Sequence, residues 1–225
     1  MGGVMNYAAV LLVSGLSLAA PQQAAQQPQQ PEERGRTQGL KETDDFVKAG
    51  NRTTSAVAEG KLQTQKTLDA YNALVTQPSK NMKGDYKKLI KSMDGMNDRV
   101  AEASKKVDEM QQAGATYFAG RAETIKGIQD ASLQGRAKER LADSQKKFDG
   151  VLKSLQDAAH ALDPFRKQLA DQITYLGSDL TPSAMTSLKP NADKLNTAAA
   201  ELFGKTDTAI SNANAYFQGL KASQS

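Results

Sequence analysis

The chain has 225 residues, 29 basic and 25 acidic side chains, one histidine, and neither cysteine nor tryptophan. The missing cysteines exclude disulfides, thiol nucleophiles and cysteine metal sites, and a single histidine excludes histidine-rich zinc sites. The net charge of +4 is spread evenly, with 8 basic and 8 acidic residues in 84–131, so no basic stripe indicates nucleic-acid binding. An aromatic content of 5% with abundant Ala, Lys, Gln and Leu favours helices over sheets.

The chain begins with an apolar stretch that predicts an export signal. The uncharged run from Tyr7 to Ala20 is shorter than the roughly 20 residues that cross a bilayer as a helix. Ser17-Leu18-Ala19 places small side chains where a signal peptidase reads the chain, so we expect a signal peptide over 1–19 and cleavage after Ala19. Because 1–6 contains no Lys or Arg, an uncleaved N-terminal membrane tether and a buried first helix are the alternatives. The main prediction is a periplasmic protein with no stable membrane span after cleavage.

A Gln/Pro-rich segment follows the apolar stretch. Residues 20–40 contain almost no bulky apolar side chain, which predicts a disordered tether. The remaining residues, 41–225, are long enough for one domain with a sizeable core.

Three groups of turn and capping residues divide 41–225 into four helical stretches. They are Thr76–Gly84, Asp130–Ser132 and Ser178–Ser183. The second stretch shows the clearest apolar pattern, in alternating steps of three and four: Tyr86, Leu89, Met93, Met96, Val100, Ala103, Val107 and Met110. The seam then shifts to Gly114, Phe118, Ile125 and Ile128. Such spacing is typical of helices that pack together like coiled coils.

The other stretches carry similar apolar faces. The third has Leu141, Phe148, Leu152, Leu155, Leu162, Phe165, Leu169, Ile173 and Leu176. The fourth has Met185, Leu188, Ala192, Leu195, Leu202, Ile210, Ala213, Phe217 and Leu220. The first is weaker, with Phe46, Val57, Leu68, Tyr71 and Val75. The prediction is an all-α fold, an elongated antiparallel bundle of about four long helices, on the order of 50–70 Å in length.

Three prolines bear on the helix boundaries. Thr181-Pro182 has the pattern of an N-cap followed by proline in the first helical turn. Asp163-Pro164 has the same pattern, but the apolar seam runs through it, so either a helix start or a kinked continuous helix fits. Pro190 leaves the same two alternatives open.

Two short patterns resemble ligand sites, and neither predicts one. Gly204-Lys205-Thr206 ends like a phosphate-binding loop, but Ala199 stands where that loop needs glycine, and the segment lies in a helical pattern. Asp157 and His160 are three residues apart on one helix face, a spacing that metal-binding bundles use. Such bundles need two Glu-x-x-His pairs with further carboxylates from facing helices, and this chain has a single histidine. We expect both segments to lie on helix surfaces and to bind no ligand.

Acidic pairs and methionines are the remaining candidates for functional residues. Asp44/Asp45 and Asp108/Glu109 are adjacent residues, which diverge on a helix, so they indicate a charged outer face. The methionines of the second seam could accommodate a partner helix, but core packing is the expected role. We therefore predict no catalytic, cofactor-binding or metal-binding residue.

Three later segments resemble a known family: Ala131–Ala158, Asp163–Leu188 and Ile210–Leu220. Their landmarks come in order as Pro164, the run Asp171–Leu176, the run Ala184–Leu188 and Tyr216-Phe217. In these features the chain resembles an uncharacterised bacterial family of exported, coiled-coil-rich helical proteins, a domain of unknown function. The resemblance implies a signal peptide and a helical body, and it supplies no catalytic residues.

These observations predict an exported, non-enzymatic structural or interaction protein of the bacterial envelope, with an envelope protein or a second copy of itself as partner. The alternative is a bundle that holds a small apolar or envelope-derived ligand between its helices, with space expected near Gly114, Ala115 and Gly120. An enzyme would need a convergent carboxylate cluster that sequence does not reveal. Binding to a membrane surface would need a strongly basic helix face, against which the even charge distribution argues.

Overall fold

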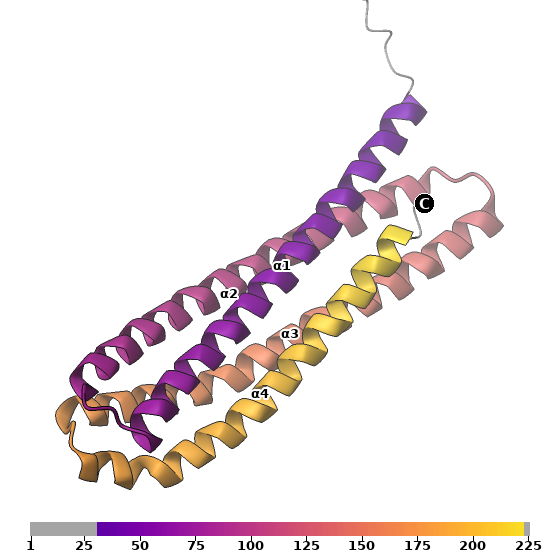
Figure 1. The fold of residues 1–225 in the computed structure, drawn as a ribbon. Helices are drawn as coiled ribbons and strands as arrows, with labels where there is room; N and C mark the ends of the chain where they lie inside the picture. Colours follow the sequence, from indigo (N-terminus) through magenta and orange to yellow (C-terminus); the bar gives the residue numbers. More distant parts are fainter. Residues whose placement is uncertain (1–30, 223–225) are drawn as a thin grey trace, which may run out of the picture.

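The protein is a bundle of four long helices. The computed structural model describes residues 31–222, which contain α1 (Pro31–Thr76), α2 (Met82–Lys126), α3 (Ala131–Ser178) and α4 (Pro182–Ala222). No strand occurs within this range. Consecutive helices run antiparallel along an elongated body, and the first turns of α1 project beyond the other helices (Figure 1). The predicted all-α bundle of four long helices is confirmed.

The helices form a ring in which each has two neighbours. α1 packs against α2 and α4, and α3 packs against the same two helices. Both ends of the described chain, the start of α1 and the end of α4, lie toward the same end of the bundle (Figure 1). The short connections between helices enforce this up-and-down order.

The first helix begins earlier than expected. α1 starts at Pro31, so the predicted tether over 20–40 is wrong for residues 31–40, which are helical. Proline suits a first helical turn, and adding polar residues to a helix that is already nucleated costs little. The predicted signal peptide, 1–19, and the tether up to residue 30 lie outside the described residues.

Pro164 and Pro190 both lie inside continuous helices. Pro164 is exposed on α3, and the apolar side chains that follow it, Phe165 and Leu169, are buried. Packing on both sides of the proline offsets the backbone hydrogen bond that it removes. Figure 1 shows that the first turns of α4, which contain Pro190, run at an angle to the rest of that helix.

Polar side chains cap the starts of three helices. The Asn81 side chain accepts a hydrogen bond from the Gly84 N–H at 3.1 Å at the start of α2. Asp130 accepts from the Leu133 N–H at 2.8 Å, and Thr181 accepts from the Ala184 N–H at 3.3 Å. Each bond satisfies a donor that the helix itself leaves without a partner. The predicted N-cap at Thr181 is therefore confirmed.

α1 carries a complete seam of buried and half-buried residues that sequence analysis saw only in part. Its members follow alternating steps of three and four: Thr43, Phe46, Gly50, Thr53, Val57, Gly60, Thr64, Thr67, Tyr71 and Leu74. Six of these ten residues are glycine or threonine, so the apolar pattern looks weak although the spacing is regular. Small seam residues let the backbone of a neighbouring helix approach closely.

Threonines of this seam join α1 to α2. The Thr53 hydroxyl donates to the Ala49 carbonyl at 2.9 Å and lies 2.7 Å from the Lys106 carbonyl oxygen across the interface. The Thr67 hydroxyl lies 3.0 Å from the Ser92 carbonyl oxygen. These bonds satisfy buried hydroxyls and hold the two helices in register.

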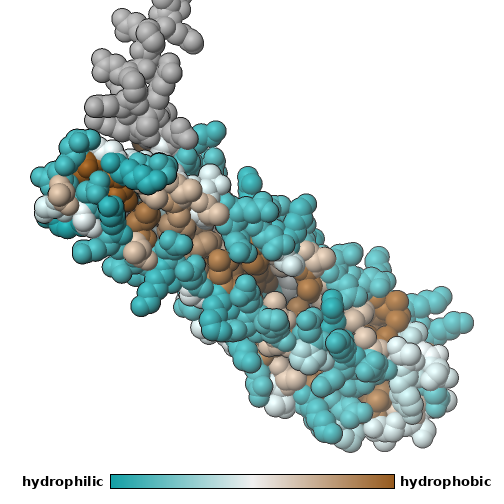
Figure 2. All heavy atoms as spheres, turned by 180° about the vertical axis from the view of Figure 1, so that it is seen from behind, coloured by the Kyte–Doolittle hydropathy of each residue, from teal (hydrophilic) through white to brown (hydrophobic). Residues whose placement is uncertain are grey.

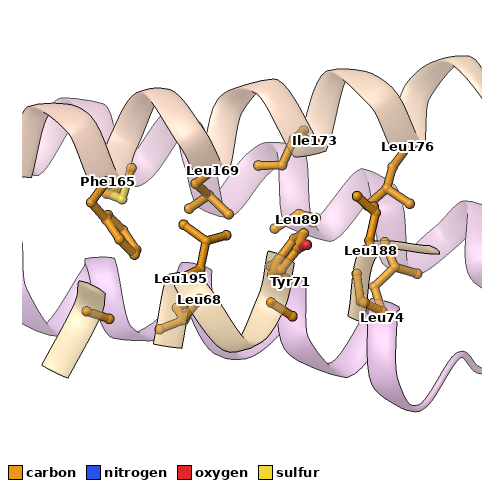
Figure 3. Packing of buried hydrophobic residues seen from close by; sticks show 14 of the residues in the cluster. Leu68, Tyr71, Leu74, Leu89, Phe165, Leu169, Ile173, Leu176, Leu188 and Leu195 are labelled. Atoms are coloured by element: carbon orange, nitrogen blue, oxygen red, sulfur yellow. The ribbon is translucent and has the colours of Figure 1, made fainter. Parts of the chain in front are cut away.

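Two apolar clusters fill the interior, one toward each end. The first lies near the α1–α2 and α3–α4 connections, where leucines from all four helices surround Tyr71 and Phe165 (Figure 3). The second holds six aromatic rings: Phe46, Tyr117, Phe118, Phe148, Tyr216 and Phe217. Phe46 is fully buried at its centre, with its ring centroid 4.8 Å from that of Phe148.

Candidate functional site

A cavity lies at mid-length, between the two apolar clusters. Its volume is about 490 Å³, and residues of all four helices line it. It contacts both clusters, since Leu202 belongs to the first and Leu155 to the second. The apolar packing is therefore interrupted at mid-length, a region that we call the waist of the bundle.

The floor of the cavity is apolar and built largely from small or short side chains. Its members are Val57, Gly60, Thr64, Val100, Ala103, Val107, Leu155, Ala158, Leu162, Leu202, Phe203 and Thr206. The two threonines donate their hydroxyl protons within their own helices, to the carbonyls of Gly60 and Leu202. The floor thus offers a surface on which an apolar group can pack without leaving a buried donor unpaired.

The rim is polar and comes mainly from α2 and α3. It includes Asn97, Ser104, Asp108, Gln111, Gln156, His160, Asp163 and Arg166. Figure 2 shows the molecule from behind the view of Figure 1, with a broken band of apolar surface running lengthwise between hydrophilic side chains. An apolar floor with a polar rim suits an amphipathic molecule.

The opening of the cavity lies between α2 and α3, the pair of neighbouring helices with the least contact. Toward one end of this interface the Tyr86 hydroxyl donates to the Ile173 carbonyl at 3.2 Å. Toward the other end, the Phe148 ring packs against the backbone of Gly114. Between these contacts the lining residues at the α2–α3 interface include the small Ala101 and Ala159, which leave the apolar interior accessible.

Four side chains that line the cavity carry a formal charge, and three of them are paired. Lys61 lies 2.6 Å from Asp207, and Arg166 lies 3.5 Å from Asp163. Within the described residues, the carboxylate of Asp108 makes no ion pair or hydrogen bond. The carboxylate of Asp108 is therefore the one charged group of the lining without an ionic partner among the described residues.

The sequence-based acidic pairs lie at the surface. Asp44 and Asp45 are exposed on α1, as expected of a charged outer face. Glu109 lies 2.8 Å from Lys106, and this hydrogen bond lowers the pKa of Glu109 and raises that of Lys106. Asp108 points to a different environment, the cavity rim, which its position next to a glutamate does not reveal.

The Asp157 and His160 pair is exposed on α3. Asp157 lies 3.0 Å from Lys153, and His160 lines the cavity rim. In residues 31–222, no three acidic or histidine side chains come together as metal ligands. Gly204, Lys205 and Thr206 lie within α4, as predicted, and not in a loop.

The methionines of the second seam lie in the core, as predicted. Met96 and Met110 are fully buried. None of Gly114, Ala115 and Gly120, near which space was expected, lines the cavity. The Phe148 ring occupies the Cβ position of Gly114, and the Glu42 carboxylate occupies that of Gly120. The cavity instead lies closer to the middle of α2, where Ala103 and Ser104 line it. Sequence analysis missed it because neither the small residues nor their spacing says how the four helices align.

The fold and this cavity define a class of protein, an antiparallel four-helix bundle with a cavity between its helices. A family model described as Protein of unknown function (DUF2959) matches residues 34–220. The chain belongs to that family, which confirms the predicted resemblance to an uncharacterised family. Searches of curated proteins and of solved structures found no match to the chain. Within residues 31–222, no helix has the length and apolar character needed to cross a membrane.

Proposed function

We propose that this is an exported, non-enzymatic protein of the bacterial envelope that holds a small, largely apolar molecule between its helices. The observation that supports binding is the cavity of about 490 Å³ lined by all four helices. Its size lies within the roughly 300–1,000 Å³ range of small-molecule sites. The export signal predicted over 1–19 supports the location.

The packing of the bundle favours a bound molecule over a simple packing defect. Helices of 41 to 48 residues bury well-packed apolar clusters on both sides of the cavity. At the waist, Gly60, Ala103 and Ala158 take positions where larger apolar residues would close the space. An empty space deprives its lining of dispersion contacts, and a bound apolar group restores them.

The test is to purify the protein from its native host and identify extracted small molecules by mass spectrometry. We expect a recurrent apolar compound near one equivalent per chain. Ala158→Phe, which places a ring inside the cavity, should lose the compound, and Ala200→Phe, at an exposed position of α4, should keep it. Equal recovery from both variants, each folded by circular dichroism, would contradict binding in the cavity.

A structural or interaction role is the second candidate, because large apolar side chains are exposed along the bundle. Leu62 is 56% exposed on α1, Leu133 51% exposed on α3, and Tyr175 42% exposed on α3. Crosslinking in living host cells would reveal a recurrent envelope protein or a second copy of the chain. One such partner with no extracted compound would favour this role.

The proposed location has its own test. The mass of the purified chain should correspond to a start near Ala20 if the signal is cleaved after Ala19. A chain that retains Met1 in the membrane fraction would indicate an N-terminal tether. A chain that retains Met1 in the cytoplasmic fraction would contradict export.

A further inference from the structure

We infer that the cavity selects a cationic amphiphile, a molecule with an apolar chain and an ammonium head, and that Asp108 binds the head. This inference rests on the proposed function and names the chemical class of its ligand.

The charges of the lining carry the inference. Lys61 and Arg166, the two basic lining residues, are already neutralised by Asp207 at 2.6 Å and Asp163 at 3.5 Å. Asp108 is the one charged lining side chain without an ionic partner in the described part of the chain. An anionic head would meet no free cation here and would be repelled by Asp108, whereas an ammonium head would gain an ion pair.

The position of Asp108 fits a molecule with two ends. Its neighbour Val107 is half-buried on the floor, while Asp108 itself is exposed at the rim of the opening. A ligand can therefore place its chain against Val107 and Leu155 and keep its charged head hydrated beside the carboxylate. This avoids the large cost of burying an ammonium group without a partner.

The experiment compares three probes with the same ten-carbon chain, decylammonium, decanoate and 1-decanol, below their micelle concentrations. Binding to the purified full chain is measured by isothermal titration calorimetry. We expect decylammonium to bind about three- to fivefold more tightly than decanol, the scale of one partly exposed ion pair, and decanoate to bind most weakly. Raising the salt concentration should reduce the advantage of decylammonium and leave decanol unchanged.

Matched variants separate charge from cavity. Asp108→Asn should abolish the preference for decylammonium and leave decanol binding unchanged. Asp98→Asn removes an exposed carboxylate of the same helix that does not line the cavity, so it should preserve the preference. Ala158→Phe and, if that variant folds poorly, Ala103→Leu should weaken all three probes.

The outcomes distinguish this inference from the function on which it rests. Equal affinities for the three probes, or an unchanged preference in Asp108→Asn, would overturn the assignment of a cationic ligand. If the cavity-filling variants still weaken binding, the cavity remains a binding site for apolar molecules. Failure of the unaltered protein to bind any probe would overturn both.

Discussion

The ring of Phe217, near the end of α4, lies against the backbone of Gly50 on α1, in the space that a Cβ atom at that position would occupy. Phe217 is 1% exposed, and its ring centroid lies 5.1 Å from that of Phe46, one turn earlier on α1. The close approach of α1 and α4 at the aromatic cluster therefore depends on a glycine in the seam of α1. A second long-range contact, between Lys61 and Asp207, joins the same two helices nearer the waist.

Gly50→Ala should destabilise the protein by about 1–3 kcal/mol, because the new methyl group meets a buried ring that has no room to move. Alanine's higher helix propensity, worth about 1 kcal/mol, offsets part of that cost. Gly150→Ala is the matched control, since nothing lies within 4 Å of the Cβ position there. It should stabilise by about 0.5–1 kcal/mol. Urea unfolding followed by circular dichroism measures both, and equal effects would contradict the contact.

Thr53→Val should cost about 1 kcal/mol, because valine keeps the shape and removes the hydroxyl that joins α1 to the Lys106 carbonyl at 2.7 Å. The control is Thr197→Val on α4, where the exposed hydroxyl bonds only within its own helix, to the Asp193 carbonyl at 3.1 Å. That change should fall within about 0.5 kcal/mol of the unaltered protein. A loss at Thr197 as large as that at Thr53 would show that the bond across the interface contributes nothing.

Asp130→Ala should destabilise by about 1 kcal/mol, because it removes the acceptor for the Leu133 N–H at the start of α3. Asp130→Asn keeps a capping oxygen and should retain most of the stability. Thermal unfolding of the two variants side by side tests this prediction. Equal losses would mean that the charge, and not the hydrogen bond, stabilises the helix start.

Stability should fall between about pH 10 and 12 because of Tyr71. Burial raises the pKa of its phenol from 10.0 to about 12, and the side chain is fully buried. The folded state therefore holds the proton more tightly than the unfolded chain. This contribution is complete below pH 10 and is lost as the pH rises toward 12, by on the order of 2 kcal/mol.

Urea midpoints at pH 9, 10 and 11 measure that loss, and Tyr71→Phe should show a shallower decline. Tyr175→Phe, at a phenol that is 42% exposed, is the control and should follow the unaltered protein. Parallel declines in all three proteins would assign the pH dependence to other groups.

Enlarging two buried alanines should change the free energy of unfolding by different amounts. Ala158 is 6% exposed and lines the cavity, so Ala158→Leu has free space to enter and should change stability by less than about 1 kcal/mol. Ala192 is 1% exposed within the first cluster, away from the cavity, and Ala192→Leu should cost about 1–3 kcal/mol. Calorimetric unfolding measures both. A comparable cost at the two sites would contradict free space at the waist.

The sequence by itself determined the helices and most of their inward faces. Apolar residues at alternating steps of three and four, as from Leu155 to Leu176, form one stripe on any α-helix, and buried residues lie along it in the structure. Turn and capping residues such as Asp130 and Thr181 marked the breaks, because their local hydrogen bonds compete with helix continuation. These are local effects that a short window of sequence contains.

Only the tertiary structure decided which small residues of α1 are buried and where the interior stays open. Gly50, Thr53 and Gly60 have no apolar signal of their own, and their burial follows from the approach of α2 and α4. The cavity depends on the axial alignment of Gly60, Ala103 and Ala158 from three helices. That alignment is the sum of contacts between residues far apart in the chain, which no local pattern encodes.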